Sequence, residues 1–180
     1  TVMWLIIDFL KISAHLSYPW DWNAISHNKS FALTAEFVME HKDFDWDWNA
    51  LSYRNDCIFI VEFIKDNKDK EWNWAFLSKR KEIVLNTDTL IALVTKEWDW
   101  NELIRRKDIE FTPDLLRLII DKDINWKAIL QRDDFYPTLE VLNILKDQSI
   151  DWSQISRRED LAANVIFLFK DKLDWKVLSH

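Results

Sequence analysis

The sequence predicts an all-α protein, an α-solenoid of stacked two-helix repeats with a period of 26 residues. Three observations lead to this prediction. Tryptophans recur at a constant interval, each begins a segment with the chemistry of a helix start, and glycine is absent from all 180 residues. About a dozen glycines are usual in a chain of this length. Their absence argues against glycine-cornered β turns and glycine-rich phosphate loops, so helices are favoured over sheets.

The period comes from the tryptophans. Eleven of the 12 tryptophans lie in seven copies of one motif, which reads large apolar residue, Asp or Asn, Trp, two variable residues, then Ile or Leu. The second aromatic position recurs every 26 residues, and a seventh copy, Trp175, follows after 23. Such spacing indicates a repeat architecture in which each unit buries its apolar face against its neighbours. The expected repeat core is Trp22, Trp48, Trp74, Trp100, Trp126 and Trp152.

Each motif predicts a first helix, the A helix, of about eight residues, such as 22–29. The Asp or Asn occupies the N-cap position, where its oxygen accepts from free backbone N–H groups. The apolar residue before it and an aliphatic residue inside the helix match a hydrophobic staple, for example Trp46 on Leu51. The aliphatic residues are Ile25, Leu51, Leu77, Leu103, Ile129, Ile155 and Leu178, and a serine usually follows, as Ser26, Ser52, Ser78, Ser156 and Ser179.

A second helix, the B helix, is expected to begin twelve residues after each motif tryptophan and to run for about ten residues. The N-caps are Thr34, Asn86, Thr112, Thr138 and Asn164, with Ile60 as the exception, and Pro113 suits the first helical position. Acids favoured by the helix dipole follow at Glu36, Glu62, Asp88, Asp114 and Glu140. The inward aliphatic row is Val38, Ile64, Leu90, Leu116, Leu142 and Leu168.

The predicted organisation is a single array over residues 1–180. Residues 1–19 are expected to form an N-terminal capping helix, and 173–180 a C-terminal cap or a truncated repeat. The repeats between them cover about 20–45, 46–71, 72–97, 98–123, 124–149 and 150–172.

Composition narrows the class of protein. Net charge is −7, so no global positive field attracts nucleic acid or anionic lipid. No signal peptide or membrane span is expected, and the single cysteine, Cys57, fits a reducing, cytoplasmic compartment. Cys57 shares its repeat position with apolar residues and is expected in the core. We expect no metal, no cofactor and no enzymatic activity, because the histidines are scattered (His15, His27, His41 and His180) and the serines recur in nearly every copy.

The motif Trp-Asp-Trp-x-x-Leu-Ser, as in residues 46–52, resembles a tryptophan-rich 26-residue repeat found in largely uncharacterised proteins of large DNA viruses and bacteria. Thr34-Ala35-Glu36 and Thr112-Pro113-Asp114 match the way that repeat opens its second helix, whereas arginine-containing segments replace its Asn-Pro. The resemblance covers nearly the whole chain. It implies a helical repeat, like tetratricopeptide arrays in general architecture, and brings no catalytic residues.

Two sets of residues are candidate partner-binding sites. The arginine column lies six residues after the motif tryptophan: Arg54, Arg80, Arg106, Arg132 and Arg158. It either forms a strip for phosphates or an acidic peptide, or is a structural ladder neutralised by the acid two residues later in each repeat, which we favour. The helix row lies seventeen residues after the tryptophan and varies between repeats: Met39, Lys65, Ile91, Arg117, Asn143 and Phe169. Solenoids recognise partners through such variable positions.

The sequence therefore favours a non-enzymatic scaffold for protein–protein interaction, with a protein or peptide partner. The alternative is a nucleic-acid-binding solenoid that uses the arginine column, with an affinity that falls steeply with salt. Acids on the B helices could also form an anionic groove, and the tryptophan pairs could form aromatic cages, but helix-dipole and core roles are favoured for them.

Overall fold

The computed structural model describes residues 19–178, and within this part all regular structure is helical, with thirteen helices and no strand. This confirms the predicted all-α class. The expected capping helix over 1–19 lies outside the described residues. The helices are α2 (Trp22–His27), α3 (Ala35–Glu40), α4 (Trp48–Ser52), α5 (Val61–Asp66), α6 (Trp74–Leu77), α7 (Thr87–Ala92), α8 (Trp100–Leu103), α9 (Pro113–Ile119), α10 (Trp126–Leu130), α11 (Leu139–Leu145), α12 (Trp152–Ser156), α13 (Ala163–Leu168) and α14 (Trp175–Leu178).

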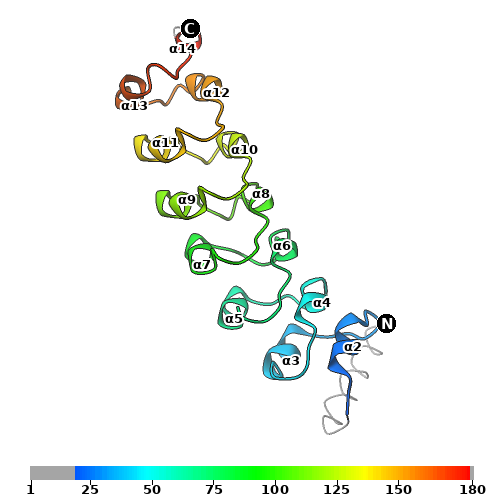
Figure 1. Ribbon diagram of the computed structural model, residues 1–180. Coiled ribbons are helices and arrows are strands. Elements are labelled where there is room, and N and C mark those ends of the chain that lie inside the picture. Colours follow the sequence, from blue (N-terminus) through cyan, green and yellow to red (C-terminus); the bar gives the residue numbers. More distant parts are fainter. Residues whose placement is uncertain (1–18, 179–180) are drawn as a thin grey trace. The chain divides into compact units, whose positions relative to one another are not determined.

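The chain forms two compact units. Among the described residues, unit 1 comprises 19–84 and 96–98, and unit 2 comprises 85–95 and 99–178. Within each unit, A helices lie in one row and B helices in a second row (Figure 1). In unit 1, α2 packs against α4; in unit 2, α9 packs against α7 and α11, and α12 packs against α14. Packing of A helix on A helix therefore occurs in both units, and packing of B helix on B helix in unit 2.

The predicted A-helix caps are present. The side chains of Asp21, Asp47, Asn73, Asp99 and Asp151 accept hydrogen bonds from backbone N–H groups of the first turn. Asn125 stands at the cap of α10 without such a bond. The A helices have four to six residues, fewer than the eight expected.

The B-helix caps follow the prediction in most repeats. Thr34, Asn86, Thr112 and Thr138 cap α3, α7, α9 and α11, and Ile60 begins α5 without a side-chain cap. These helices span six or seven residues rather than the ten expected.

The prediction for the sixth repeat is wrong at two residues. Helix α13 begins after Ala162, so Asn164 lies inside its first turn and is not the cap. Leu168 is 53% exposed, and Val165 takes the inward position instead. The cause is a shortened repeat, since Trp175 follows Trp152 by 23 residues rather than 26. The helix begins earlier, and its apolar face moves with it.

In unit 1, tryptophans join successive repeats. Five of the six expected core tryptophans are buried, and Trp152 is half-buried. The ring of Trp22 lies 5.1 Å from that of Trp46, and Trp48 lies 4.9 Å from Trp72. Burying a large apolar side chain contributes about 1.5–3 kcal/mol. Trp175, in the last A helix, is 55% exposed.

The first tryptophan of a motif also forms a hydrogen bond with the C-terminal end of the preceding B helix. The indole Nε1–H of Trp46 donates to the carbonyl of His41 at 2.8 Å, and Trp72 donates to Asn67 at 2.9 Å. His41 and Asn67 are the C-cap residues of α3 and α5. The predicted packing of Trp46 on Leu51 stays a prediction, and the ring contacts observed for Trp46 include Trp22, Phe37 and Phe44.

The motif serine is a second link between repeats. The buried hydroxyl of Ser52 donates to the carbonyl of Trp48 at 2.8 Å and accepts from the backbone N–H of Asn73 at 3.0 Å. Ser26 makes the same pair of bonds with Trp22 and Asp47. The serine thus fixes the residue that caps the next A helix.

We predict that Ser52→Ala lowers the free energy of unfolding by about 1–3 kcal/mol, because the N–H of Asn73 loses its partner. Urea denaturation followed by far-UV circular dichroism measures the change. Ser30→Ala, at an exposed position, is the matched control and should change stability by less than about 0.5 kcal/mol. Equal stability of the two variants would contradict the serine link.

Candidate functional site

The arginine column lies largely in the interior. Arg54, Arg80 and Arg106 are buried, with Arg54 only 2% exposed. The guanidinium of Arg54 donates to the carbonyls of Ile25 at 3.3 Å and Asn28 at 2.9 Å, and also bonds the carbonyl of Phe31. All three carbonyls belong to the end of the preceding A helix or to the loop after it. The arginine therefore caps the A helix of the repeat before it.

The same geometry recurs in both units. In unit 1, Arg80 donates to the carbonyls of Ser52 at 3.2 Å and Arg54 at 3.0 Å. In unit 2, Arg132 donates to the carbonyls of Ile104 and Arg106 at 2.8 Å and of Ile109 at 2.9 Å. The Arg132 guanidinium also lies 5.2 Å from the ring centroid of Phe111. Short A helices leave carbonyls without helical partners, and these arginines satisfy them.

Four of the five arginines form hydrogen bonds to the acid two residues later, and the fifth, Arg80, lies 4.0 Å from Glu82. Arg54 and Asp56 form two hydrogen bonds, Nε–Oδ1 at 2.9 Å and Nη2–Oδ2 at 2.5 Å. Asp56 also accepts from the backbone N–H of Leu33 at 3.1 Å. Burial opposes ionisation of Asp56, but the bonds from Arg54 and Leu33 outweigh it and lower the pKa of the carboxyl. Asp108 behaves likewise, with Arg106 and the N–H of Leu85 as partners.

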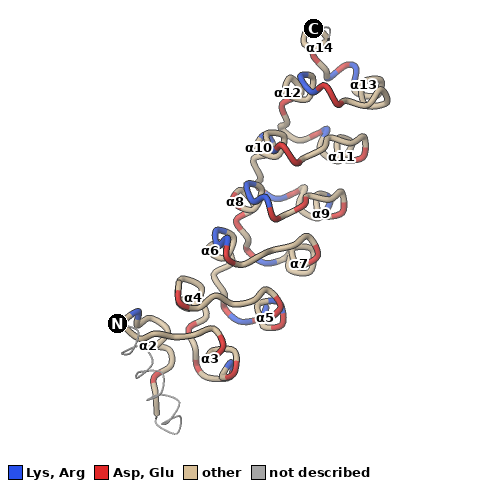
Figure 2. The backbone as a smooth tube through the Cα atoms, turned by 180° about the vertical axis from the view of Figure 1, so that it is seen from behind, with Lys and Arg blue, Asp and Glu red and all other residues tan. Residues whose placement is uncertain are grey.

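The arginines therefore differ in what they offer a partner. Arg54, Arg80 and Arg106 have little exposed surface, whereas Arg132 and Arg158 are half-buried. Arg158 retains its bond to Asp160, at 2.9 Å. Figure 2 shows that basic and acidic positions lie close together on the loops after α8 and α12 in unit 2.

The helix row faces outward in part. Lys65, Arg117 and Asn143 are exposed, and Met39 and Ile91 are half-buried. Phe169, the sixth member, is buried, in keeping with the shift of α13. Arg117 pairs with Asp114 on its own helix and with Glu140 on α11. At Arg117, then, part of the row links neighbouring B helices.

A set of outward residues on the loops from A to B helices was not anticipated from the sequence. We call it the loop column; it lies ten residues after each motif tryptophan: Ala32, Ile58, Val84, Glu110, Tyr136 and Ala162. Ile58, Val84 and Tyr136 are exposed large apolar residues, and Glu110 is exposed as well. The sequence signal was available, because this position changes its chemical type between repeats although both flanking positions stay apolar in most copies.

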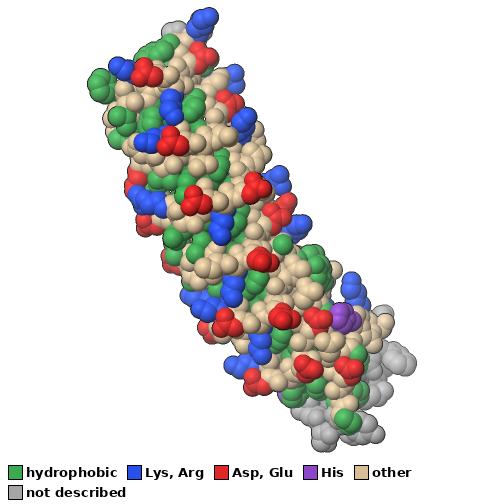
Figure 3. Space-filling model, viewed as in Figure 1, with side chains coloured by type: hydrophobic (Ala, Val, Ile, Leu, Met, Phe, Trp, Pro, Cys, Tyr) green, Lys and Arg blue, Asp and Glu red, His purple; other side chains and the backbone are tan. Residues whose placement is uncertain are grey.

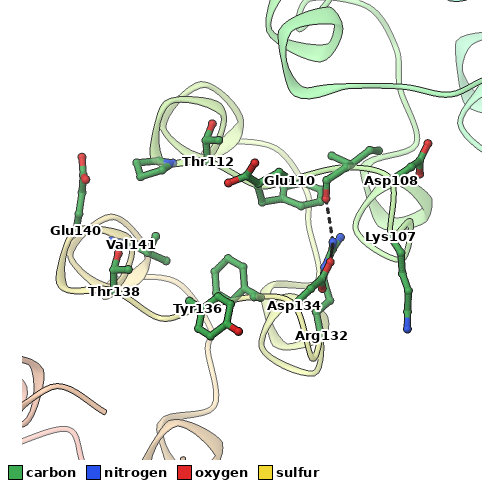
Figure 4. A pocket seen from close by; sticks show the side chains of 14 residues that line it. Lys107, Asp108, Glu110, Thr112, Arg132, Asp134, Tyr136, Thr138, Glu140 and Val141 are labelled. Carbon is green, nitrogen blue, oxygen red and sulfur yellow. Dashed lines mark hydrogen bonds and ion pairs between the residues drawn. The ribbon is translucent and has the colours of Figure 1, made fainter. Parts of the chain in front are cut away.

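The loop column of unit 2 borders a cleft of about 550 Å³ between the loops after α8 and α10. Phe111, Phe135 and Val141 are buried side chains that contribute to its lining. Figure 4 shows Glu110 on one wall and Tyr136 on the other, with the Arg132 bond to Ile109 beside them. The cleft therefore combines an apolar interior with a carboxylate and an aromatic ring at its edge.

The other reactive groups have structural surroundings. Burial raises the pKa of the Cys57 thiol to about 12, so the thiol is protonated at neutral pH. His27 pairs with Asp47 at 2.8 Å, and His41 bonds the carbonyl of Phe37. His15 and His180 lie outside the described residues. Within residues 19–178, no group of three or more His, Cys, Asp or Glu side chains is placed to hold a metal ion.

Comparison of the chain with protein-family models, with curated proteins and with solved structures finds no match. None of the described helices is both long and apolar enough to cross a bilayer.

We predict that Arg54→Ala lowers the free energy of unfolding by about 2–4 kcal/mol, because several buried carbonyls lose their donor. Arg54→Lys should recover little of this stability, because a lysine ammonium lacks the planar set of N–H donors of a guanidinium. The control is Arg105→Ala, an exposed arginine paired with Glu102, which should cost less than about 1 kcal/mol. A similar loss in both alanine variants, measured by urea denaturation, would contradict the capping role.

The lowered pKa of Asp56 predicts a dependence of stability on pH. Its folded pKa lies below the ordinary value of 3.8, so its contribution is present above that value and is lost as pH falls through the folded pKa. The urea concentration at the midpoint of unfolding, measured at successively lower pH, should decrease as the pH falls through the folded pKa of Asp56. The decrease should be smaller in Asp56→Asn. An unchanged acid profile in the variant would overturn the assignment.

Proposed function

We propose that the chain is a non-enzymatic scaffold that binds protein or peptide segments along its loop column. One observation carries the proposal. Polar side chains that recur between repeats are used inside the array, as Arg54, Ser52 and Asp47 illustrate, whereas the exposed loop position differs from repeat to repeat. A constant frame with variable outward residues is how repeat proteins recognise partners.

Exposed apolar side chains on the loops of unit 1 support the proposal. Tyr53, Ile58, Ile60 and Val84 are all substantially exposed there. Exposed apolar residues in one region are typical of surfaces that contact another protein. In unit 2, Tyr136 adds an aromatic residue of the kind enriched at binding hot spots.

The alternative, a nucleic-acid-binding solenoid, has less support. Its arginines are largely buried and bonded to carbonyls, so few of their charges are left for phosphates. On the face seen in Figure 3, basic side chains are intermixed with acidic and apolar ones rather than gathered in one strip. In unit 2, Arg105 and Lys107 are exposed basic residues that flank Arg106 of the arginine column. A test of the nucleic-acid alternative should therefore replace these two residues.

We also propose that the chain is a relative of the tryptophan-rich 26-residue repeat proteins that its motif resembles. The buried tryptophans and the capping Asp residues support this relationship, because the two features that define the motif have structural roles here.

The proposal predicts that a displayed library of random peptides, selected on the full 180-residue chain, yields peptides that bind at the loop column. Binding should weaken about five-fold or more on Ile58→Ser or Tyr136→Ala, because each removes an exposed apolar contact. Fluorescence anisotropy of the labelled peptides gives the affinity. Leu118→Ala, which alters an exposed apolar residue on helix α9 instead of the loops, is the control.

Enriched peptides that bind all variants equally, or no enrichment at all, would remove the proposal. A labelled single-stranded oligonucleotide is measured in parallel. Tight binding that falls steeply with salt and is lost on Arg105→Glu with Lys107→Glu would favour the nucleic-acid alternative.

A further inference from the structure

The cleft of unit 2 has an unusual pair of neighbours at its edge. Glu110 and Tyr136 occupy the same position in successive repeats, 26 residues apart, and both line the cleft. Tyr136 is 66% exposed, so its ring is largely open to solvent. In Figure 4 the two side chains stand on opposite walls. A carboxylate and an open aromatic ring thus border one hollow.

The ion pairs around this cleft leave one carboxylate for a cation. Four carboxylates and two basic side chains line it. Asp108 and Asp134 are paired with Arg106 and Arg132 at 2.5 and 2.6 Å, and Glu140 is paired with Arg117. Among the described residues, no basic side chain forms an ion pair with the carboxylate of Glu110. Figure 4 shows Lys107 extending away from Glu110 and Tyr136, so the Glu110 carboxylate is available to a partner.

The ring of Tyr136 adds a second attraction for the same cation. An aromatic face draws a lysine or arginine head group, and the interaction is strongest where water is excluded. Phe111 and Phe135 also line the cleft, and although they are largely buried, the parts that reach its surface are apolar and suit the aliphatic stem of such a side chain. An arginine or lysine can therefore place its stem on the apolar interior and its charge between Glu110 and Tyr136.

The hollow continues along the unit. A second depression, shared with the first at Tyr136, Thr138 and Glu140, extends to Asp160 and Val165. It adds the carboxylate of Asp160, which is paired with Arg158 at 2.8 Å, and no basic side chain to the lining. A groove that passes over the loops of three successive repeats suits an extended segment rather than a compact ligand.

We infer that this groove binds an extended basic segment of a partner protein and seats one arginine or lysine between Glu110 and Tyr136. The inference rests on the proposed interaction function and specifies its partner. The unpaired carboxylate of Glu110 disfavours a nucleic acid, because a phosphate that entered the cleft would approach it.

The test uses three synthetic peptides with blocked ends, in which alternate positions are arginine, citrulline or glutamate and the others are alanine. Each is labelled and titrated with the full chain, and anisotropy gives its affinity. The arginine peptide should bind most tightly and the glutamate peptide should show no measurable binding. Citrulline keeps the shape of arginine without its charge, so it separates the contribution of charge from that of contact area.

Substitutions in the chain test where the arginine peptide binds. Glu110→Gln and Tyr136→Ala should each weaken the arginine peptide about five-fold, whereas Tyr136→Phe should keep most of the affinity because it retains the ring. Asp121→Asn removes one charge at an exposed position after α9 and is the control for net charge. Glu110→Lys should abolish binding of the arginine peptide and confer binding of the glutamate peptide.

The outcomes are separable. Arginine-dependent binding that follows these variants supports the inference. Equal binding of the arginine and citrulline peptides, or an effect of Asp121→Asn as large as that of Glu110→Gln, overturns it. If basic peptides fail while library-selected peptides still bind at the loop column, the groove assignment is wrong and the proposed function stands. If no peptide binds, both are overturned.

Discussion

The architecture depends on carbonyl groups that the short A helices cannot satisfy themselves. A helix of four to six residues leaves most of its carbonyls without an internal partner. Arg54 supplies donors to the end of α2 from the following repeat, and Arg132 does the same for the carbonyls after α8. In these cases a repeat is completed by the next one, and the arginines that cap it are largely withdrawn from the surface.

This constraint also shapes the outer face. The arginine enters the array at the start of the loop from A to B helix, and its acid partner fixes the loop, as Asp56 does through Arg54 and the N–H of Leu33. The next inward residues, such as Cys57 and Phe59, pack into the core. Ile58 between them is left outside, and so is its counterpart Tyr136. The loop column is a geometric consequence of anchoring the loop on both sides.

Local chemistry made much of the fold predictable. Caps such as Asp47 and Thr112 act within three residues of their own position, so their roles can be inferred from spacing. Asn164 and Leu168 were misplaced because a shortened sixth repeat breaks the constant register on which that inference relied. The lengths of the A helices were overestimated for a different reason. At the end of α2 the carbonyl of Ile25 bonds Arg54 of the next repeat, and spacing within one repeat does not contain such a contact.

The candidate site was less accessible to sequence reasoning. The helix row was chosen because its members vary, yet Phe169 is buried and Arg117 is engaged by Glu140. The loop column varies less than the helix row, and its exposure depends on the anchoring of the loops. The proximity of Glu110 and Tyr136 across a cleft depends on the stacking of two repeats, and one repeat's sequence does not contain that information.

The most direct test of this account is native-state hydrogen exchange of Arg132→Met, a variant that removes the donors to Ile104, Arg106 and Ile109. If arginines complete the preceding repeat, amide protection should fall most in residues 98–149 and remain near that of the unaltered chain in residues 20–71, since interactions in such arrays are between neighbours. Unchanged protection in 98–149 would contradict the account, and so would an equal loss along the whole chain.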